Sequence, residues 1–214
     1  MTEGKVSVPQ PVLKRLPRYL HYLRGKKQEG MERISSTVIS ADLGLNPVQV
    51  RKDLAYISDS GKPRTGFSVE ELVRDLSLFL GYGSTKDAVL VGAGNMGRTL
   101  LAYKGFAGYG LNILAAFDIR EDLAGTEICG KPVFPVNRIP EMTERLCASI
   151  GIITVPPEAA QEACDLLVAG GVQAIWNFAP VHLKVPDHVV VQSENLAVSL
   201  TALRMQMKNQ KPFC

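Results

Sequence analysis

The sequence predicts an α/β protein in which an N-terminal winged helix-turn-helix domain precedes a Rossmann-type domain with a doubly wound parallel sheet. Three observations support this fold class. Residues 1–66 hold twelve Lys and Arg against six Asp and Glu, whereas residues 67–214 hold twelve against fifteen. The segment VLVGAGNMG, which begins at Val89, joins an apolar strand to closely spaced glycines. Apolar strands then alternate with helices, the order that produces a parallel sheet.

The first eighty residues have the pattern of a small helical domain with a basic ribbon. Apolar residues at helical spacing from Leu13 to Leu23 predict a first helix that ends at Gly25, with its regular part starting at Pro17. Two short helices follow, STVISADLG and VQVRKDLAYI, separated at Asn46-Pro47. This pair predicts a helix-turn-helix. The glycines and proline of DSGKPRTGFS predict a wing, and VEELVRDLSLFLG predicts a closing helix.

The second short helix and the wing are the expected DNA contacts. A basic module suits a polyanion, although a solvated Lys-rich surface has the same composition. Gln, Arg and Lys side chains can bond base edges, and cations in the wing would hold phosphates. The predicted DNA-binding residues are Asn46, Gln49, Arg51, Lys52, Tyr56, Lys62 and Arg64.

The composition changes after a short linker. DAVLVG is an apolar run typical of a strand buried in a parallel sheet, and NILAAFD, SIGIITV, QAIWNF and HVVVQ predict further strands. We therefore expect a winged-helix domain at 1–80, a linker at 81–85, a dinucleotide-binding domain at 86–192 and a C-terminal helix at 193–214. That helix has an apolar stripe at Leu196, Leu200, Leu203 and Met207.

The glycine-rich segment predicts a dinucleotide site. Its G-x-G-x-x-G pattern follows a strand and opens a helix, whose N-terminus would face the pyrophosphate. The next predicted strand ends at Asp118, where a carboxylate can accept bonds from ribose hydroxyls and would repel a 2′-phosphate. This favours NAD(H) over NADP(H), although Arg120 weakens the preference. The predicted contacts here are Gly92, Ala93, Gly94, Asn95, Met96, Gly97 and Asp118.

Later strand ends would form the other wall of this site, because ligands bind at the carboxyl ends of such strands. Thr154, Pro156, Asn177 and Phe178 are the residues expected there, and they include no carboxylate. An apolar pocket penalises the positive nicotinamide of NAD+ by desolvation, so we expect a preference for NADH.

Several functional classes are disfavoured. No apolar run approaches the ~20 residues of a membrane span, and no signal peptide is expected. The four cysteines are widely spaced, which argues against a metal site or disulfides and favours a reducing cytoplasm. His182 is the sole candidate proton donor near a nicotinamide, so we expect no catalytic residue and no small-molecule substrate. Three alternatives stay open: a small NAD-dependent reductase, a regulator that binds coenzyme A, and a constitutive DNA-binding protein.

Four stretches of the chain are far more specific than a general fold pattern: VQVRKDLAYI, GKPRTGFSVEEL, VGAGNMGRTLLAYKGF and TVPPEAAQEACDLLVAGGVQAIWNFAP. In these stretches the chain resembles the Rex family of bacterial redox-sensing transcriptional repressors. The resemblance implies a homodimer that binds a palindromic operator and is released by NADH. It also implies a C-terminal dimerisation helix exchanged between subunits, and a role for Tyr103 near the nicotinamide. Some relatives pair an Arg of the first helix with an Asp at the start of the last helix. His21 and Asn195 stand at those positions here.

Overall fold

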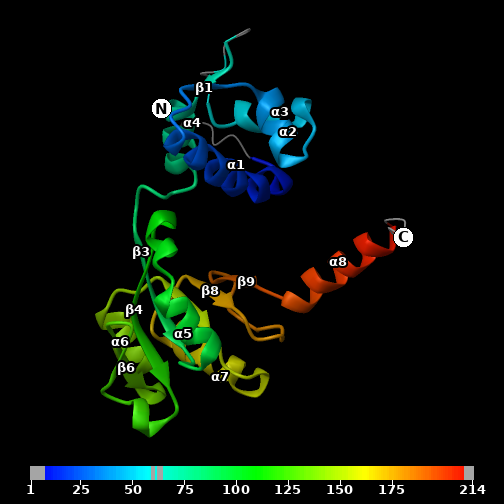
Figure 1. The fold of residues 1–214 in the computed structure, drawn as a ribbon. Coiled ribbons are helices and arrows are strands. Elements are labelled where there is room, and N and C mark those ends of the chain that lie inside the picture. The colour runs from blue at the N-terminus through cyan, green and yellow to red at the C-terminus, as the bar shows by residue number, and fades with distance from the viewer. Residues whose placement is uncertain (1–7, 59–60, 62–64, 210–214) are drawn as a thin grey trace. The chain divides into compact units, whose positions relative to one another are not determined.

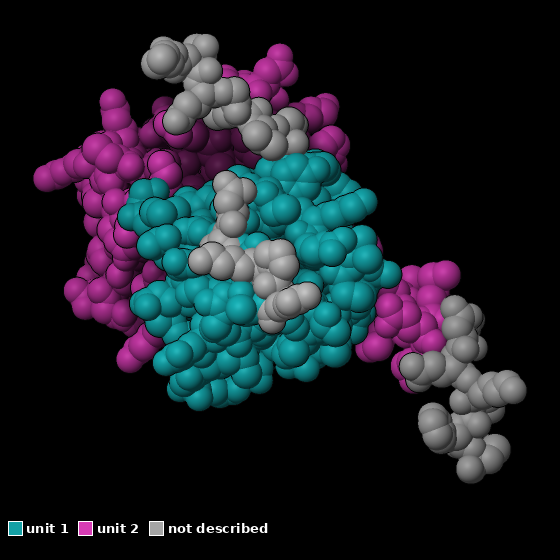
Figure 2. All heavy atoms as spheres, turned by 90° about the horizontal axis from the view of Figure 1, so that it is seen from above, with its two compact units in different colours: residues 1–84 teal, residues 85–214 magenta. Residues whose placement is uncertain are grey.

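The chain folds into two compact units. The structure is a computed structural model that describes residues 8–58, 61 and 65–209. Unit 1 spans residues 1–84 and unit 2 spans residues 85–214 (Figure 2). The division falls within the predicted linker, and the predicted C-terminal segment is grouped with unit 2. The functional domain boundaries stay a prediction.

Unit 1 is a helical domain with a two-stranded ribbon (Figure 1). Its second, third and fourth helices begin after polar residues, because the Ser35, Asn46 and Ser68 side chains each accept a backbone N–H of the turn that follows. Gly44, in the left-handed conformation, ends the second helix. The elements are α1 Gln10–Gln28, β1 Arg33–Ile34, α2 Ser36–Leu43, α3 Pro47–Ala55, β2 Phe67–Ser68 and α4 Val69–Phe79.

The first helix is longer than predicted at both ends. It starts at Gln10, contains Pro17 in its interior and continues through Gly25 to Gln28. An interior proline costs about 3 kcal/mol because it removes a hydrogen bond. Burial of the apolar stripe on both sides of Pro17, at about 1.5–3 kcal/mol per large side chain, offsets that cost. The buried residues of α1 are Val12, Leu16, Tyr19, Leu20 and Leu23.

The ribbon of unit 1 pairs two short strands that are far apart in the sequence. β1 and β2 are antiparallel, with Ile34 opposite Phe67. Gly66 has a φ of +68°, and a Cβ there would lie 2.4 Å from the Ile34 carbonyl oxygen, so this position requires glycine. The predicted wing residues Lys62 and Arg64 lie outside the described residues.

Unit 2 contains the predicted parallel sheet. Its strands lie in the order β5-β6-β4-β3-β7-β8-β9, and every pair except β5–β6 is parallel. Without β5, this is the 3-2-1-4-5-6 order of a Rossmann fold. The strands are β3 Lys86–Val91, β4 Leu111–Asp118, β5 Glu127–Ile128, β6 Lys131–Pro135, β7 Ile150–Ile153, β8 Ala174–Asn177 and β9 Val190–Ser193.

Helices cover both faces of this sheet. Val89 and Phe117 pack with residues of α6 and α7, whereas the neighbouring Leu90 and Ala116 pack with Leu101 of α5. The helices that cover the sheet are α5 Asn95–Ala102, α6 Ile139–Arg145 and α7 Pro157–Ala169. The C-terminal helix is α8 Leu196–Asn209, and 3-10 helices lie at Lys104–Tyr109, Glu121–Leu123 and Val136–Arg138. No helix in the described part of the chain has the length and apolar character needed to span a membrane.

Candidate dinucleotide site and nucleic-acid interface

The candidate dinucleotide site lies where strand order reverses, at the carboxyl ends of β3 and β7. Thr154 ties these two ends together. Its backbone N–H donates to the Val91 carbonyl at 2.9 Å, and its Oγ1 donates to the Gly92 carbonyl at 2.7 Å. A crevice at such a switch point is where ligands bind in open α/β sheets.

The three glycines of the fingerprint have different surroundings. Gly92 has a φ of +99°, and an added Cβ would lie 2.8 Å from Val155 Cγ1. At Gly97 a Cβ would lie 2.0 Å from the Gly92 carbonyl oxygen, so this glycine lets α5 pack against the strand. At Gly94 a Cβ would meet nothing within 4 Å. The backbone at Gly94 is therefore open to a ligand, as a pyrophosphate requires.

Asp118 bonds to the glycine loop. It is 7% exposed, and its Oδ2 accepts the Ala93 backbone N–H at 2.7 Å. Its Oδ1 accepts the backbone N–H and the Nε of Arg120 at 2.9 and 3.2 Å. A carboxylate has about four acceptor sites, so Asp118 keeps a site for a ribose hydroxyl while it orients the loop.

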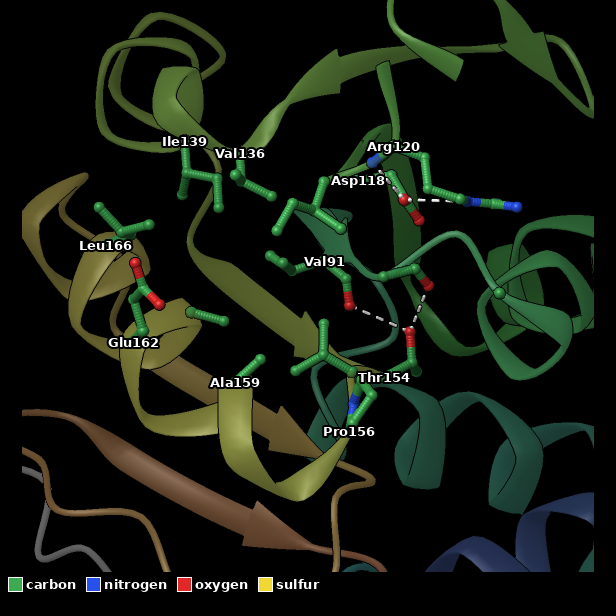
Figure 3. Close-up of a pocket in the computed structure, with 15 residues that line it drawn as sticks. Val91, Asp118, Arg120, Val136, Ile139, Thr154, Pro156, Ala159, Glu162 and Leu166 are labelled. Atoms are coloured by element: carbon green, nitrogen blue, oxygen red, sulfur yellow. Dashed lines mark hydrogen bonds and ion pairs between the residues drawn. The ribbon is translucent and has the colours of Figure 1, made fainter. Parts of the chain in front are cut away.

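A cavity of about 310 Å³ opens beside these groups. In Figure 3, Asp118 and Arg120 lie on one side and the α7 residues Ala159, Glu162 and Leu166 lie on the other. The cavity is lined by Val91, Gly92, Gly94, Asp118, Ile119, Arg120, Val136, Ile139, Thr154, Val155, Pro156, Ala159, Glu162, Ala163 and Leu166. Its size falls within the range of small-ligand sites.

The structure brings part of the predicted cofactor set together. Among the predicted residues, Gly92, Gly94, Asp118, Thr154 and Pro156 line the cavity.

The remaining predicted cofactor residues of the loop and of α5 do not line this cavity. Ala93 and Gly97 are buried next to the loop, and Asn95 and Met96 are exposed at the start of α5. Tyr103, which follows α5, lines a separate hollow with Phe106 and Lys104. Direct contact of these residues with a cofactor stays a prediction.

Asn177 and Phe178 belong to the end of β8. The Asn177 amide donates to the Ala179 and Val181 carbonyls at 3.0 Å, and its Oδ1 accepts the Ala179 N–H at 2.9 Å. This side chain therefore shapes its own loop. The Phe178 ring packs 4.8 Å from Trp176. Their predicted place at the nicotinamide stays untested.

Sequence reasoning missed one wall of the cavity. Val136 and Ile139 follow β6, a strand with the sequence KPVFP, and two prolines in five residues hide it from pattern recognition. Glu162 lies on the predicted helix α7, but helical spacing alone does not reveal that its side chain faces a cavity. The place of α7 in the sequence could have indicated this role, because α7 directly follows β7, whose carboxyl end lies at the switch point.

The Cys164 thiol of unit 2 has little nucleophilic character. Cys164 is buried, and this burial raises the pKa of its thiol to about 11, which keeps the thiol protonated near neutral pH. Among the described residues, no three His, Cys, Asp or Glu side chains gather as they would around a metal ion.

The candidate nucleic-acid interface lies on α3 of unit 1. Arg51 and Lys52 are exposed, Tyr56 is 40% exposed, and Gln49 is half-buried. Asn46 is exposed, but its Oδ1 accepts the N–H groups of Val48 and Gln49 at 2.8 and 3.3 Å. Its amide NH₂ is the group left to face a ligand. Contact between these side chains and DNA stays a prediction.

Two family models match successive parts of this chain, and full-length relatives match nearly all of it. A family model described as a CoA binding domain matches residues 84–181, and one described as a putative DNA-binding protein N-terminus matches residues 7–55. A redox-sensing transcriptional repressor Rex from Treponema denticola is 40% identical over 209 residues, 97% of this chain and 100% of the relative. The Rex of Porphyromonas gingivalis is 41% identical over 203 residues, 95% of this chain and 93% of the relative.

Solved structures of RSP, described as a Rex-family repressor, match as well. The complex of RSP with NAD+ and operator DNA has a TM-score of 0.89 and 36% identity, covering 96% of this chain and 94% of that one. The complex of RSP with NADH has a TM-score of 0.86 and 35% identity, covering 96% of each chain.

Proposed function

This chain belongs to the Rex family of redox-sensing transcriptional repressors, and we propose which residues carry out that function here. It is a DNA-binding regulator and not an enzyme, and it responds to the balance of NADH and NAD+. The observation that carries this conclusion is that one chain joins a helix-turn-helix unit to an open fingerprint loop and matches whole repressors over nearly its full length.

Helix α3 enters the major groove of the operator. Support comes from the exposure of Arg51 and Lys52 on a helix whose opposite face is buried in unit 1. Arg and Lys read guanine edges, and phosphate contacts set the position of the protein. Gln49, Tyr56 and Asn46 stand at the edges of the same surface. Lys62 and Arg64 complete the proposed interface.

Unit 2 binds NAD+ and NADH at the fingerprint loop. Gly94 is open toward the cavity, and Asp118 ends the strand next to it. The matched model's name mentions coenzyme A, whereas the solved relatives hold NAD+ and NADH. Asp118 supports NAD+ and NADH over coenzyme A, because its negative charge would repel the 3′-phosphate on the ribose of coenzyme A. The geometry therefore favours an adenosine with free ribose hydroxyls.

The preference for NADH rests on the far end of the site. The Asn177 side chain is hydrogen-bonded to the backbone of the loop that follows it. Phe178 packs against Trp176, and both of these side chains are aromatic. Asn177 and Phe178 supply no negative charge to a nicotinamide cation. Desolvation then disfavours NAD+ relative to NADH. By linkage, the factor by which NADH weakens DNA binding equals the factor by which DNA weakens NADH binding.

The functional unit is a homodimer in which α8 packs on a second copy. The helix has 14 residues, and its described side chains are exposed, including Val198, Leu200, Leu203, Met205 and Met207. Many exposed apolar side chains on one helix indicate an interaction site. A dimer would present two α3 helices to a palindromic operator. Because such a repressor acts on chromosomal DNA, we place it in the cytoplasm.

Fluorescence anisotropy with a palindromic duplex tests this function. The duplex is selected from a random library with the purified chain, and NADH and NAD+ are titrated separately at fixed salt. Release by NADH that excess NAD+ resists is the expected result. Tight DNA binding that neither NADH nor NAD+ changes would contradict the proposed redox sensing but not the proposed DNA binding.

A further inference from the structure

The first helix holds both helices of the helix-turn-helix through a repeated pair of side chains. Arg18 and Tyr22 bond to α2: Arg18 Nη2 donates to the Leu43 carbonyl at 2.8 Å, and the Tyr22 hydroxyl donates to Asp42 at 2.7 Å. These contacts lie at the surface, where the Asp42 side chain is 44% exposed. Water can replace such bonds at little cost.

The second pair, Arg15 and Tyr19, bonds to a buried carboxylate of α3, whereas the Arg15 side chain itself is 23% exposed. Arg15 Nε and Nη2 donate to the two carboxylate oxygens of Asp53 at 2.7 and 2.9 Å. The Tyr19 hydroxyl donates to Asp53 Oδ2 at 2.7 Å. Tyr19 is fully buried, and the Asp53 side chain is 4% exposed. One carboxylate of α3 is therefore held by three directed bonds from α1.

A gain in the folding stability of unit 1 does not by itself explain the hydrogen-bonded group formed by Arg15, Tyr19 and Asp53. Replacing a buried ion pair by apolar side chains of similar volume is often neutral or stabilising, because the charges lose their hydration. A two-pronged Arg–carboxylate bond does differ from apolar packing in one respect, since it fixes orientation. Arg51 lies two residues from Asp53, about 200° around the helix, so a bond that fixes Asp53 also fixes the exposed face.

We propose that Arg15 and Tyr19 are positioning residues for operator recognition, which set the rotation of α3 by holding Asp53. This proposal rests on the proposed function of α3. Base readout needs side chains held within about 0.5 Å of the productive geometry, whereas phosphate contacts tolerate more movement. Loosening Asp53 therefore lowers the preference for the operator over random DNA more than it lowers DNA binding itself.

The first test compares single variants with a matched control. Asp53→Asn keeps the shape but places an amide NH₂ near the Arg15 donors, and Tyr19→Phe removes one hydroxyl. Asp42→Asn makes the same chemical change in the exposed bond to α2. Each variant is titrated with the selected operator and with a scrambled duplex. We expect Asp53→Asn to reduce the ratio of the two affinities by about tenfold, the scale of one lost base contact, and Asp42→Asn to leave it unchanged.

The second test separates positioning from stability. The triple variant Arg15→Met, Tyr19→Phe and Asp53→Leu replaces the polar group by apolar side chains, which can keep the melting temperature near that of the wild-type chain. A lowered affinity ratio at matched melting temperature, with NADH binding intact, supports the proposal. A wild-type ratio in this variant overturns it. If the triple variant does not fold, an unchanged ratio in folded Asp53→Asn or Tyr19→Phe overturns it equally.

Failure of the proposed function gives a different result. A wild-type chain that shows no preference for any selected duplex would overturn both the operator function and the positioning role. A wild-type preference that every folded Asp53 variant retains would overturn the positioning role alone.

Discussion

The carboxylate of Asp118, at the end of β4, accepts the backbone N–H of Ala93 in the fingerprint loop at 2.7 Å. The loop is therefore held by the residue that the sequence singled out as a ribose ligand. Under the proposed function, the same side chain would also accept a hydrogen bond from the cofactor ribose. Substitutions at Asp118 should affect both the loop and this bond.

Asp118→Asn should weaken NADH binding about tenfold to a hundredfold. The amide oxygen can still accept one bond, but the charge is lost, and hydrogen bonds to charged groups contribute about 1.5–3 kcal/mol. Titration of NADH fluorescence measures the effect. Asp122→Asn, an exposed neighbour in the 3-10 helix Glu121–Leu123, is the control with the same chemical change. Equal affinity in the two variants would remove Asp118 from the cofactor site.

The fingerprint glycines should separate folding from binding. Gly97→Ala puts a Cβ 2.0 Å from the Gly92 carbonyl, which the backbone cannot easily avoid, so it should lower stability by about 1–3 kcal/mol or more. Gly94→Ala meets no protein atom within 4 Å and lines the cavity, so it should fold normally and bind NADH poorly. Thermal melting and NADH titration are measured on both variants. Normal NADH affinity in Gly94→Ala would place the pyrophosphate elsewhere.

Lys52→Ala should reduce operator affinity by about 1–3 kcal/mol. If Lys52 holds a phosphate, the slope of log affinity against log salt concentration also decreases in magnitude by about one. If Lys52 contacts a base, its loss mainly lowers the preference for the operator over other DNA. Anisotropy at several salt concentrations distinguishes the two roles. Lys86→Ala, exposed at the start of β3 in unit 2, is the matched control. Unchanged affinity and slope in Lys52→Ala would mean that α3 does not face DNA.

Tyr19 should make unit 1 sensitive to alkali. Burial and the bond to Asp53 raise the pKa of Tyr19 from 10.0 to about 12. The folded state then holds this proton more tightly than the unfolded state, so the resulting stability is fully present below pH 10 and is lost as the pH rises toward 12. Chemical denaturation of wild-type and Tyr19→Phe chains between pH 9 and 12 should show a shallower decline in the variant. Tyr56→Phe, at an exposed tyrosine, serves as the control, and parallel curves for wild type and Tyr19→Phe would contradict the assignment.

Much of the secondary structure can be predicted from short-range sequence patterns. The caps at Ser35 and Asn46, the strand before Gly92 and the alternation of strands with helices in unit 2 each depend on residues close in the sequence. Local hydrogen bonds and burial periodicity decide such features, so they can be predicted without tertiary contacts. Where burial overrides local preference, as around Pro17 in α1, prediction failed.

The two kinds of domain, the glycine fingerprint and the candidate residues Asp118, Arg51 and Lys52 can all be predicted from the amino-acid sequence alone. Three relationships depend on tertiary packing: Val136 and Glu162 face the same cavity, Asp118 holds the glycine loop, and Arg15 meets Asp53 across 38 residues of chain. The reason is physical: a helix or strand reports which of its faces is apolar, but the partner of a buried polar side chain depends on packing between distant segments.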